Sequence, residues 1–438
     1  MTLPDRVPKQ RYYDPDFYAL EVEHLWPRVW QMACRLEEIP DAHDFAEYEI
    51  LDQSIIVVRT EDLGVTAFQN ACRHRGVKVA VDRGTCDSGF TCPFHGWCYG
   101  PDGKNTAVTR RRMFSEHNLQ AGDLDLTPVR CETWGGCAWI NLDADAPPLR
   151  ACIEPFATIQ DAWEVEAYRT EWWRAFRLPV NWKLAEEAFL EQYHVLESHP
   201  QLRIPGRMVP RDPAAFDPRT WVEAELHYLR VMNEGMAGMV HGNDVRIAER
   251  LRDIELPAAP GDAIATWNRT LNEAVVQWHR SEGHVIPDLN ALDDDGLNQP
   301  MGYCFPHYFM LPMYSSASSY RFRPLGPEET LMEIWSLTRF PEGEVRPKPE
   351  RPEVWAFDDP RVPPIPTQDF SNLPKQQRGL HNRGFEYLRL SEHLEGGVAN
   401  FERMVDGFVG GLPYDTLLPA LAQINVNPLE RPVLDLGF

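Results

Sequence analysis

Two pairs of residues near the start of the chain each combine a cysteine with a histidine. One residue separates Cys72 from His74, two residues separate Cys92 from His95, and seventeen residues lie between the two pairs. The chain has nine cysteines, an odd count, and a disulfide does not require a histidine beside each cysteine. Two thiolates and two imidazoles offered by two short loops therefore predict a metal centre.

Two kinds of metal centre use these four ligands. A Rieske [2Fe–2S] cluster places two thiolates on one iron and two neutral imidazoles on the other, which raises its reduction potential. A structural zinc of the Cys2His2 type uses the same set, but zinc fingers usually keep their cysteines together and their histidines together. Here each pair is mixed. The ligand order favours the cluster, and a zinc-stabilised binding protein remains the alternative.

A second pair of candidate ligands, His194 and His199, lies in the segment NWKLAEEAFLEQYHVLESHP. Two histidines and one carboxylate form the facial triad of non-haem Fe(II) oxygenases. A spacing of five places these histidines roughly 140° apart on an ideal helix, so both can bind one metal only if the helix bends or ends between them. Pro200 favours such an end. Otherwise both histidines are surface or satisfied core residues.

The segment with these histidines belongs to the second of two differently patterned regions. Residues 16–35 have apolar spacing typical of a helix, and residues 44–145 alternate in the manner of short strands with Gly- and Asp-containing turns. These patterns predict a helical segment over 1–43, a small β domain over 44–148 and a larger domain over 149–438.

The larger domain is predicted to mix strands and helices. Asn181 can cap a helix over 182–197 that ends before Pro200. Residues 205–300 are polar and carry no readable motif. The other elements expected from periodicity are strands over 171–180, 303–322 and 330–340, and a helix around 393–408.

Bulk composition narrows the classes of partner. The 438 residues are enough for two or three domains, and 43 basic against 66 acidic residues give a net charge of −23. Such a charge repels phosphate backbones and anionic membranes. The N-terminus has no apolar core typical of a translocation signal, and no apolar run is long enough for a bilayer. We therefore expect a cytoplasmic protein that binds neither nucleic acid nor membrane.

Several segments resemble the large (alpha) subunits of Rieske non-haem iron oxygenases, also called ring-hydroxylating oxygenases. NACRHRGVKVA and CPFHGWCYGPDG resemble their cluster-binding loops, and PVRCETWGGCAWINLD resembles the closing strands of the same domain. The family also opens its iron-binding segment with NWK. The resemblance implies an α+β fold, with a small all-β Rieske domain and a helix-grip catalytic domain in which helices cover a curved antiparallel sheet. In this interpretation Gly76, Gly96 and Trp97 shape and shield the cluster loops.

The resemblance also implies the ligands of both metal centres. A [2Fe–2S] cluster would be held by Cys72, His74, Cys92 and His95, and a mononuclear Fe(II) by His194 and His199 with one carboxylate. One branch of the family places that carboxylate eight residues before a Gln-Arg-Gly triplet, here residues 377–379, which selects Asp369. Asp358, Asp359 and Glu392 remain competitors.

Two further carboxylates precede His194. Intervals of four and three place Glu187, Glu191 and His194 on one face of a continuous helix. In the family a carboxylate three before the histidine, usually Asp, bridges it to a cluster histidine of the neighbouring subunit, and this chain has the longer Glu191. Glu187 stands where the family often has Asn. It either supports the metal ligands or lies on a solvated helix face.

These features lead us to expect a terminal oxygenase. It would pass electrons from the cluster to Fe(II) and use O2 to mono- or dioxygenate a hydrophobic, aromatic or alicyclic small molecule. The chain has neither a G-x-G-x-x-G fingerprint nor a plant-type ferredoxin motif, so NAD(P)H would act only through a separate reductase, with or without a ferredoxin. The resemblance implies a head-to-tail homotrimer, with or without a small beta subunit. The alternatives are an O- or N-demethylase and a pure electron carrier.

Overall fold

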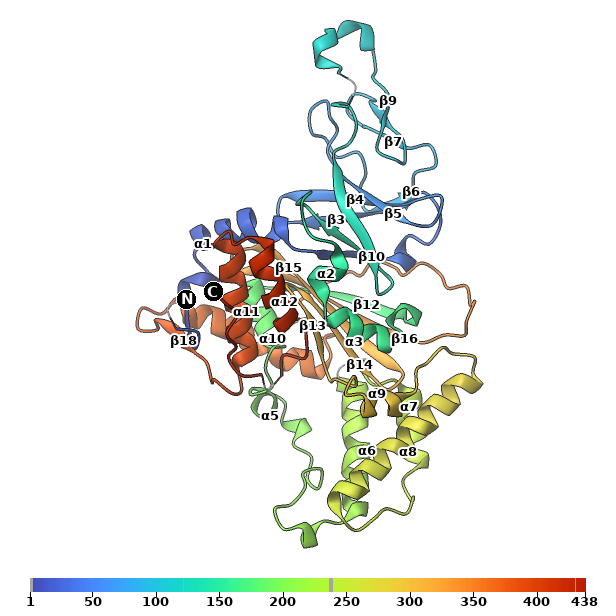
Figure 1. Ribbon diagram of the computed structural model, residues 1–438, viewed down its shortest axis with the longest axis vertical. Helices are drawn as coiled ribbons and strands as arrows, with labels where there is room; N and C mark the ends of the chain where they lie inside the picture. The colour runs from blue at the N-terminus through green and yellow to red at the C-terminus, as the bar shows by residue number, and fades with distance from the viewer. Residues whose placement is uncertain (1–2, 121, 236–238, 430) are drawn as a thin grey trace.

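The computed structural model describes residues 3–120, 122–235, 239–429 and 431–438. Its upper part in Figure 1 is all-β. A seven-stranded antiparallel sheet has the order β2-β11-β10-β5-β4-β3-β6. Its strands are β2 (Gln31–Arg35), β3 (Asp44–Ile50), β4 (Gln53–Arg59), β5 (Val65–Gln69), β6 (Arg83–Thr85), β10 (Pro128–Trp134) and β11 (Cys137–Asn141).

A smaller antiparallel sheet carries the loop with the second Cys-His pair. It has the order β7-β8-β9, with β7 (Phe90–Thr91), β8 (Cys98–Tyr99) and β9 (Asn105–Ala107). A separate hydrophobic cluster, which includes Phe68, Phe90 and Trp97, fills the space between the two sheets and includes both candidate cysteine ligands. The candidate loops therefore rest on a packed base.

The larger domain is built on a six-stranded sheet with the order β13-β14-β15-β16-β12-β17. Only the β12–β17 pair is parallel. The strands are β12 (Arg169–Leu178), β13 (Gly302–Cys304), β14 (Tyr308–Met313), β15 (Ser316–Gly326), β16 (Glu329–Thr338) and β17 (Val354–Ala356). A further two-stranded sheet pairs β1 (Arg6–Pro8) with β18 (Tyr387–Arg389).

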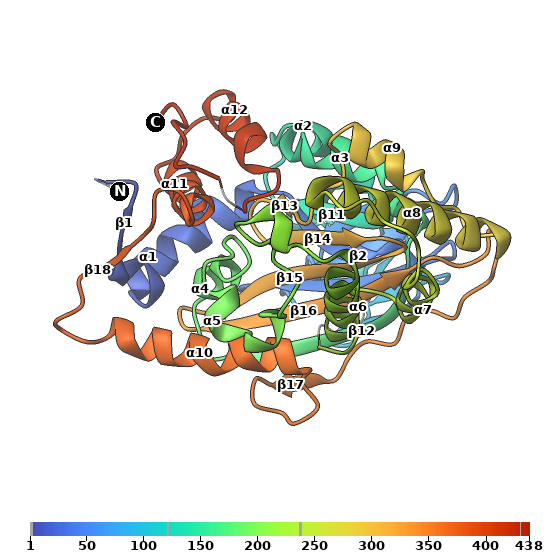
Figure 2. The same ribbon diagram turned by 90° about the horizontal axis from the view of Figure 1, so that it is seen from below.

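Helices cover the face of the six-stranded sheet that lies away from the all-β part (Figures 1 and 2). In Figure 2, α10 lies along one side of the sheet, and α11 and α12 lie beyond the other. The helices of this domain are α2 (Leu149–Ile153), α3 (Phe156–Ala162), α4 (Trp182–Glu187), α5 (Val195–Ser198), α6 (Pro218–Gly235), α7 (Gly242–Arg250), α8 (Pro260–Ser281), α9 (Leu289–Asp294), α10 (Pro364–Leu380), α11 (Gly396–Val409) and α12 (Tyr414–Ile424). The predicted fold class is confirmed.

The predicted helix over 16–35 is only partly present. α1 (Pro15–Leu20) is capped by Asp14, whose side chain accepts a hydrogen bond from the backbone N–H of Asp16. One π-helical turn and one 3-10 turn extend it to Arg28, and the chain then becomes strand β2. Pro27 supplies no N–H to the next turn, and all five residues of β2 are buried, so sheet packing overrides the helical spacing.

Strand β2 connects the two sheets. One of its edges pairs with β11, and the backbone N–H of Met32 donates to Nε2 of His307 in the larger domain at 3.3 Å. Nη1 of Arg321 on β15 donates to the carbonyls of Met32 and Ala33 at 2.8 and 2.6 Å. The division into 1–43, 44–148 and 149–438 remains a prediction, and the pairing of β2 favours an earlier start for the β domain.

Among the residues that the structure describes, no helix is both long and apolar enough to cross a bilayer.

Candidate metal centres

The two cluster-type loops have the same backbone pattern. The carbonyl of Cys72 accepts a hydrogen bond from the N–H of Gly76 at 2.8 Å, and the carbonyl of Cys92 accepts one from Gly96 at 2.9 Å. Both cysteine side chains are buried at 2% exposure. The two loops are therefore equivalent supports, each presenting one thiol from a turn of five residues.

Gly76 and Gly96 have positive φ angles of 78° and 72°. An added Cβ at Gly76 would meet no atom within 4 Å. The left-handed backbone, which glycine adopts without strain, is therefore a sufficient reason for glycine at Gly76, independent of any approach to sulfides.

Among the four candidate ligands, the two thiols lie together and the two imidazoles lie together. The thiols of Cys72 and Cys92 contact each other, and the rings of His74 and His95 lie edge to face with centroids 4.6 Å apart. Trp97 stacks on His74 at 5.0 Å and an interplanar angle of 12°. Nδ1 of His74 is buried and has no hydrogen-bond partner in the described part of the chain. One imidazole nitrogen is thus buried, unpaired and available to a metal.

This arrangement fits a cluster better than a single zinc ion. Within the described ranges, only His194, His199 and Asp369 form a group of three or more metal-ligating side chains with ligand atoms within 4.8 Å of one another. All four loop residues are described, yet their ligand atoms form no such group. The ligands of a tetrahedral zinc lie about 2.0–2.3 Å from the ion, so their ligand atoms would have to lie close enough together to form one. Two thiols on one side and two imidazoles on the other match a Rieske cluster.

Tyr99 of β8 was not among the residues predicted from the sequence. Its hydroxyl accepts a hydrogen bond from the N–H of Arg73 at 2.9 Å and lies 3.2 Å from Sγ of Cys72. Since its oxygen already accepts one hydrogen bond, its own proton can be donated to the sulfur. In the sequence, the one signal for Tyr99 is its position just after the second loop.

The predicted helix over 182–197 is wrong, because it is interrupted. Asn181 caps α4 as predicted, its side chain accepting from the N–H of Lys183 at 3.0 Å. However, α4 ends at Glu187, and α5 begins only after His194. In between, Leu190 turns into the core at 1% exposure, so burial overrides the local helical propensity.

The interruption changes the predicted arrangement of the carboxylates. Glu187, Glu191 and His194 do not share one helical face, since only the first lies in a helix. Glu191 nevertheless reaches His194, because its Oε1 lies 2.5 Å from Nδ1 of the histidine. α5 ends at Ser198, so the helix stops between the two histidines.

His194, His199 and Asp369 converge. Helix α10 carries Asp369, whose Oδ1 lies 3.1 Å from Nε2 of His199 and 3.7 Å from Nε2 of His194. The three side chains present two ring nitrogens and a carboxylate oxygen to one point, as a facial triad requires. The competitors Asp358, Asp359 and Glu392 are described and do not belong to this group.

The other nitrogen of each imidazole is held by a side-chain acceptor. Nδ1 of His194 bonds to Glu191, and Nδ1 of His199 lies 2.6 Å from Oε1 of Gln368. Both partners are acceptors, so both Nδ1 atoms carry the proton and both Nε2 lone pairs face Asp369. Burial lowers the pKa of His199, but Asp369 and Gln368 raise it, and the net shift is upward. Sequence reasoning did not find Gln368, although it precedes Asp369.

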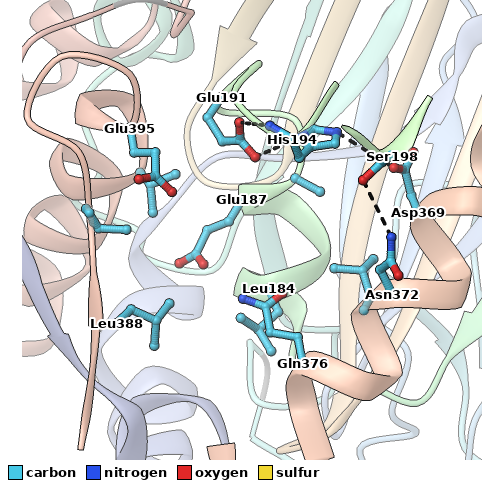
Figure 3. Close-up of a pocket in the computed structure, with 14 residues that line it drawn as sticks. Leu184, Glu187, Glu191, His194, Ser198, Asp369, Asn372, Gln376, Leu388 and Glu395 are labelled. Carbon is cyan, nitrogen blue, oxygen red and sulfur yellow. Dashed lines mark hydrogen bonds and ion pairs between the residues drawn. The ribbon is translucent and has the colours of Figure 1, made fainter. Parts of the chain in front are cut away.

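A cavity of about 140 Å³ opens on one side of this triad (Figure 3). Glu187, Glu191, His194 and Asp369 line it, and Glu395 faces them from the start of α11. Glu187 therefore does not lie on a solvated helix face, because it is 6% exposed and forms part of the cavity wall.

Aromatic side chains pack near the triad. Phe189 lies between α4 and α5 with its ring centroid 5.0 Å from Tyr320 and 6.0 Å from Phe309. Burial, followed by the charge of Asp369, raises the pKa of Tyr320, so Tyr320 lies within electrostatic reach of the triad. Trp335 belongs to another hydrophobic cluster, where it stacks on Trp173 at 5.0 Å.

Two family models match the chain. The model of the Rieske [2Fe-2S] domain matches residues 29–118. The model described as the ring hydroxylating alpha subunit (catalytic domain) matches residues 161–411, which is more than half of the chain. The chain belongs to the ring-hydroxylating oxygenase alpha-subunit family. The resemblance noted in the sequence is thereby confirmed, and with it the family's cofactors, a Rieske cluster and a mononuclear iron.

Curated relatives of this alpha subunit include both monooxygenases and dioxygenases. It is 30% identical over 202 residues to the carnitine monooxygenase oxygenase subunit of Escherichia coli K12, covering 44% of this chain and 52% of the relative. It is 31% identical over 189 residues to the 2-aminobenzenesulfonate 2,3-dioxygenase subunit alpha of an Alcaligenes species, covering 42% and 47%. These matches span about half the length of either relative. A longer match, 28% over 404 residues, covers 90% of this chain and 84% of the glycine betaine monooxygenase oxygenase subunit of Chromohalobacter salexigens.

Solved structures share the fold. A quaternary ammonium Rieske monooxygenase in complex with L-carnitine has a TM-score of 0.61 at 17% identity, over 93% of this chain and 97% of that chain. A naphthalene 1,2-dioxygenase variant bound to phenanthrene has a TM-score of 0.64 at 17% identity, over 95% and 96%.

Proposed function

We propose that this alpha subunit is the terminal component of an oxygenase that hydroxylates a small organic molecule with O2. Cys72, His74, Cys92 and His95 would hold the Rieske cluster, and His194, His199 and Asp369 the mononuclear iron. When bound, the cluster supplies single electrons and the iron activates oxygen. The observation that carries this proposal is the convergence of two imidazole nitrogens and one carboxylate oxygen within 4.8 Å of one another.

The side chains around the iron site have separable roles in this proposal. Glu191 and Gln368 fix the tautomer and the orientation of the two histidines. Leu184, Leu373 and Val398 supply apolar parts of the cavity wall that suit a hydrophobic substrate. Glu191 would also connect His194 to the electron donor.

A second copy of the chain is the electron donor that we propose. Figure 1 shows the cluster loops at one end of the molecule and α5 in the opposite half. One solved relative is described in terms of inter-subunit electron transfer. This supports a head-to-tail homotrimer in which the cluster of one subunit faces Glu191 of the next, with a separate reductase, with or without a ferredoxin, reducing the cluster.

A monooxygenase that acts on an N-methyl group is the second candidate. A relative that matches over most of its length is a glycine betaine monooxygenase subunit. Hydroxylation of an N-methyl group releases formaldehyde, whereas dioxygenation of an arene leaves a stable diol. Assaying both products with aromatic and N-methylated compounds separates the two candidates.

The variant His194→Ala tests the iron assignment. We expect iron to fall from about three to about two atoms per chain, the visible spectrum of the cluster to persist, and product formation to cease. Glu197→Gln, on the short helix α5 that follows His194 but outside the cavity, is the control and should match the parent protein. Normal turnover by His194→Ala would overturn the assignment.

A further inference from the structure

Glu187 occupies an unusual position for a carboxyl group. It ends helix α4, lines the cavity beside His194, and is 6% exposed. Its Oε1 accepts a hydrogen bond from the hydroxyl of Tyr12 at 2.7 Å. Figure 3 shows Glu187 below Glu191 on the cavity wall, with Glu395 on the facing segment. Glu187 is thus a buried residue that lines the same cavity as His194 and Asp369 of the iron site.

A second buried carboxyl group, that of Glu402 on α11, contacts Glu187. Glu402 is 0% exposed, and its Oε2 accepts from Nε of Arg11 at 2.5 Å. Its Oε1 is buried and has no hydrogen-bond donor among the described residues. Two adjacent buried carboxylates cannot both be ionised at low energetic cost, and a proton on Glu187 would supply a donor at this contact.

The charges around the pair also favour a neutral Glu187. Nζ of Lys183 is 2.5 Å from Oε1 of Glu21, and both side chains are fully buried. Arg11 is shared by Glu402 and Asp406. Without Glu187, this region already contains two cations, Lys183 and Arg11, and three carboxylates, Glu21, Glu402 and Asp406. Burial, followed by the charge of Glu402, raises the pKa of Glu187 well above its ordinary value.

We propose that Glu187 carries a proton in the resting protein and donates it to oxygen that is reduced in this cavity. The proposal rests on the oxygenase function proposed above. Monooxygenation of R–H consumes O2, two electrons and two protons and yields R–OH and water. The redox partner supplies the electrons, and one of the two protons comes from the carboxyl group of Glu187, which becomes a carboxylate hydrogen-bonded to Tyr12.

Glu395 is the group through which Glu187 regains its proton. It lines the same cavity and is only partly buried, so it can exchange protons with solvent. A cavity of about 140 Å³ has room for several water molecules between the two carboxyl groups. Burial raises the pKa of Glu395, and so does Glu191, although the N–H of Ser391 opposes this. Glu395 is therefore suited to hold and pass a proton.

The variant Glu187→Gln tests the proposal, because an amide can still accept from Tyr12 and donate to Glu402 but cannot release a proton. We expect the infrared absorption of a protonated carboxyl group, measured without substrate or turnover, to lose one component. We expect the rate of product formation after reduction of the cluster to fall about a hundredfold, as is typical when a general acid is lost. Cluster absorbance, iron content and substrate binding should be unchanged.

Two comparisons make the result decisive. Glu197→Gln, an exposed carboxylate outside the cavity, should leave both the infrared band and the rate unchanged. An unchanged infrared spectrum in Glu187→Gln, or a normal product rate despite the loss of the band, would overturn the proposal. Failure of the oxygenase function itself would appear differently, as a parent protein that binds iron at neither site or forms no product.

Discussion

At the scale of single residues, the decisive interactions are those behind the metal-facing atoms. The two histidines present Nε2 to Asp369 because Nδ1 of each is held, one by a carboxylate and the other by an amide. Gln368 is itself positioned by Gln201, since the two amides exchange hydrogen bonds at 2.8 and 3.0 Å. The orientation of His199 therefore depends on two residues that do not face the metal position.

Replacing Gln368 by Met should weaken iron binding at the mononuclear site. Met has a similar length but no strong acceptor, so His199 would lose the partner that fixes its tautomer, and iron affinity should fall about 10- to 100-fold. The measurement is a titration of Fe(II) into protein stripped of mononuclear iron. Ser371→Ala, on the exposed side of the same helix, is the control. Equal affinities for the two variants would show that Gln368 does not orient the ligand.

At the scale of elements, the shortness of α5 brings the two histidines together. A continuous helix would place them on diverging directions, whereas α5 begins only after His194 and ends at Ser198, so the two histidines flank a single turn. Asn181 fixes where this assembly starts, because its side chain caps α4 and its Nδ2 donates to the carbonyl of Pro327 at 2.7 Å.

Asn181→Ala should destabilise the catalytic domain by about 1–2 kcal/mol, since it removes the cap and a second hydrogen bond. Thermal unfolding monitored by circular dichroism measures the change. Asn181→Ser restores a capping oxygen without the amide donor and should recover part of the loss. If the Asn181→Ala variant and the parent protein unfold at the same temperature, the cap does not contribute to stability.

Local sequence signals predicted the residues of the candidate iron site better than the helices that carry them. Motif spacing selected the residues that converge, including Asp369 on α10, far from the histidines in the chain. It could not show the break after Glu187, because Leu190 leaves the helix to fill a core assembled from distant segments. Tyr99, Gln368 and Glu402 were missed for the same reason, since each gains its role from a contact that only folding creates.

At the scale of the whole molecule, His307 joins the two sheets. Its Nδ1 donates to the carbonyl of Phe322 at 2.9 Å, and its Nε2 accepts from the N–H of Met32 on β2. Complete burial, together with the nearby charge of Arg321, lowers the pKa of His307 from 6.5 to about 3. The junction between the domains is therefore built on a neutral imidazole.

The free energy of unfolding should fall as the pH decreases below the pKa of a free histidine side chain. The folded chain keeps His307 neutral to about pH 3, whereas the unfolded chain binds a proton near pH 6.5, so unfolding takes up a proton between these values. This one group should remove about 1.4 kcal/mol per pH unit over that interval and nothing above it.

Thermal unfolding midpoints measured from about pH 8 to about pH 5 test this linkage. His307→Gln, which can donate to Phe322 and accept from Met32 but does not titrate, should show a shallower dependence on pH. Parallel curves for the two proteins would mean that His307 does not set the acid sensitivity.

The position of β2 has a consequence for protein engineering. One way to exchange the redox domain between members of this family is to build a chimaera. A chimaera joined at residue 44 would take β3 to β11 from one parent and β2 from the other. The foreign strand would have to match β11 along one edge and the side chains of His307 and Arg321 along the other. A crossover placed before Gln31, with His307 and Arg321 matched to the donor, should give hybrids that fold, because both edges then keep their native partners.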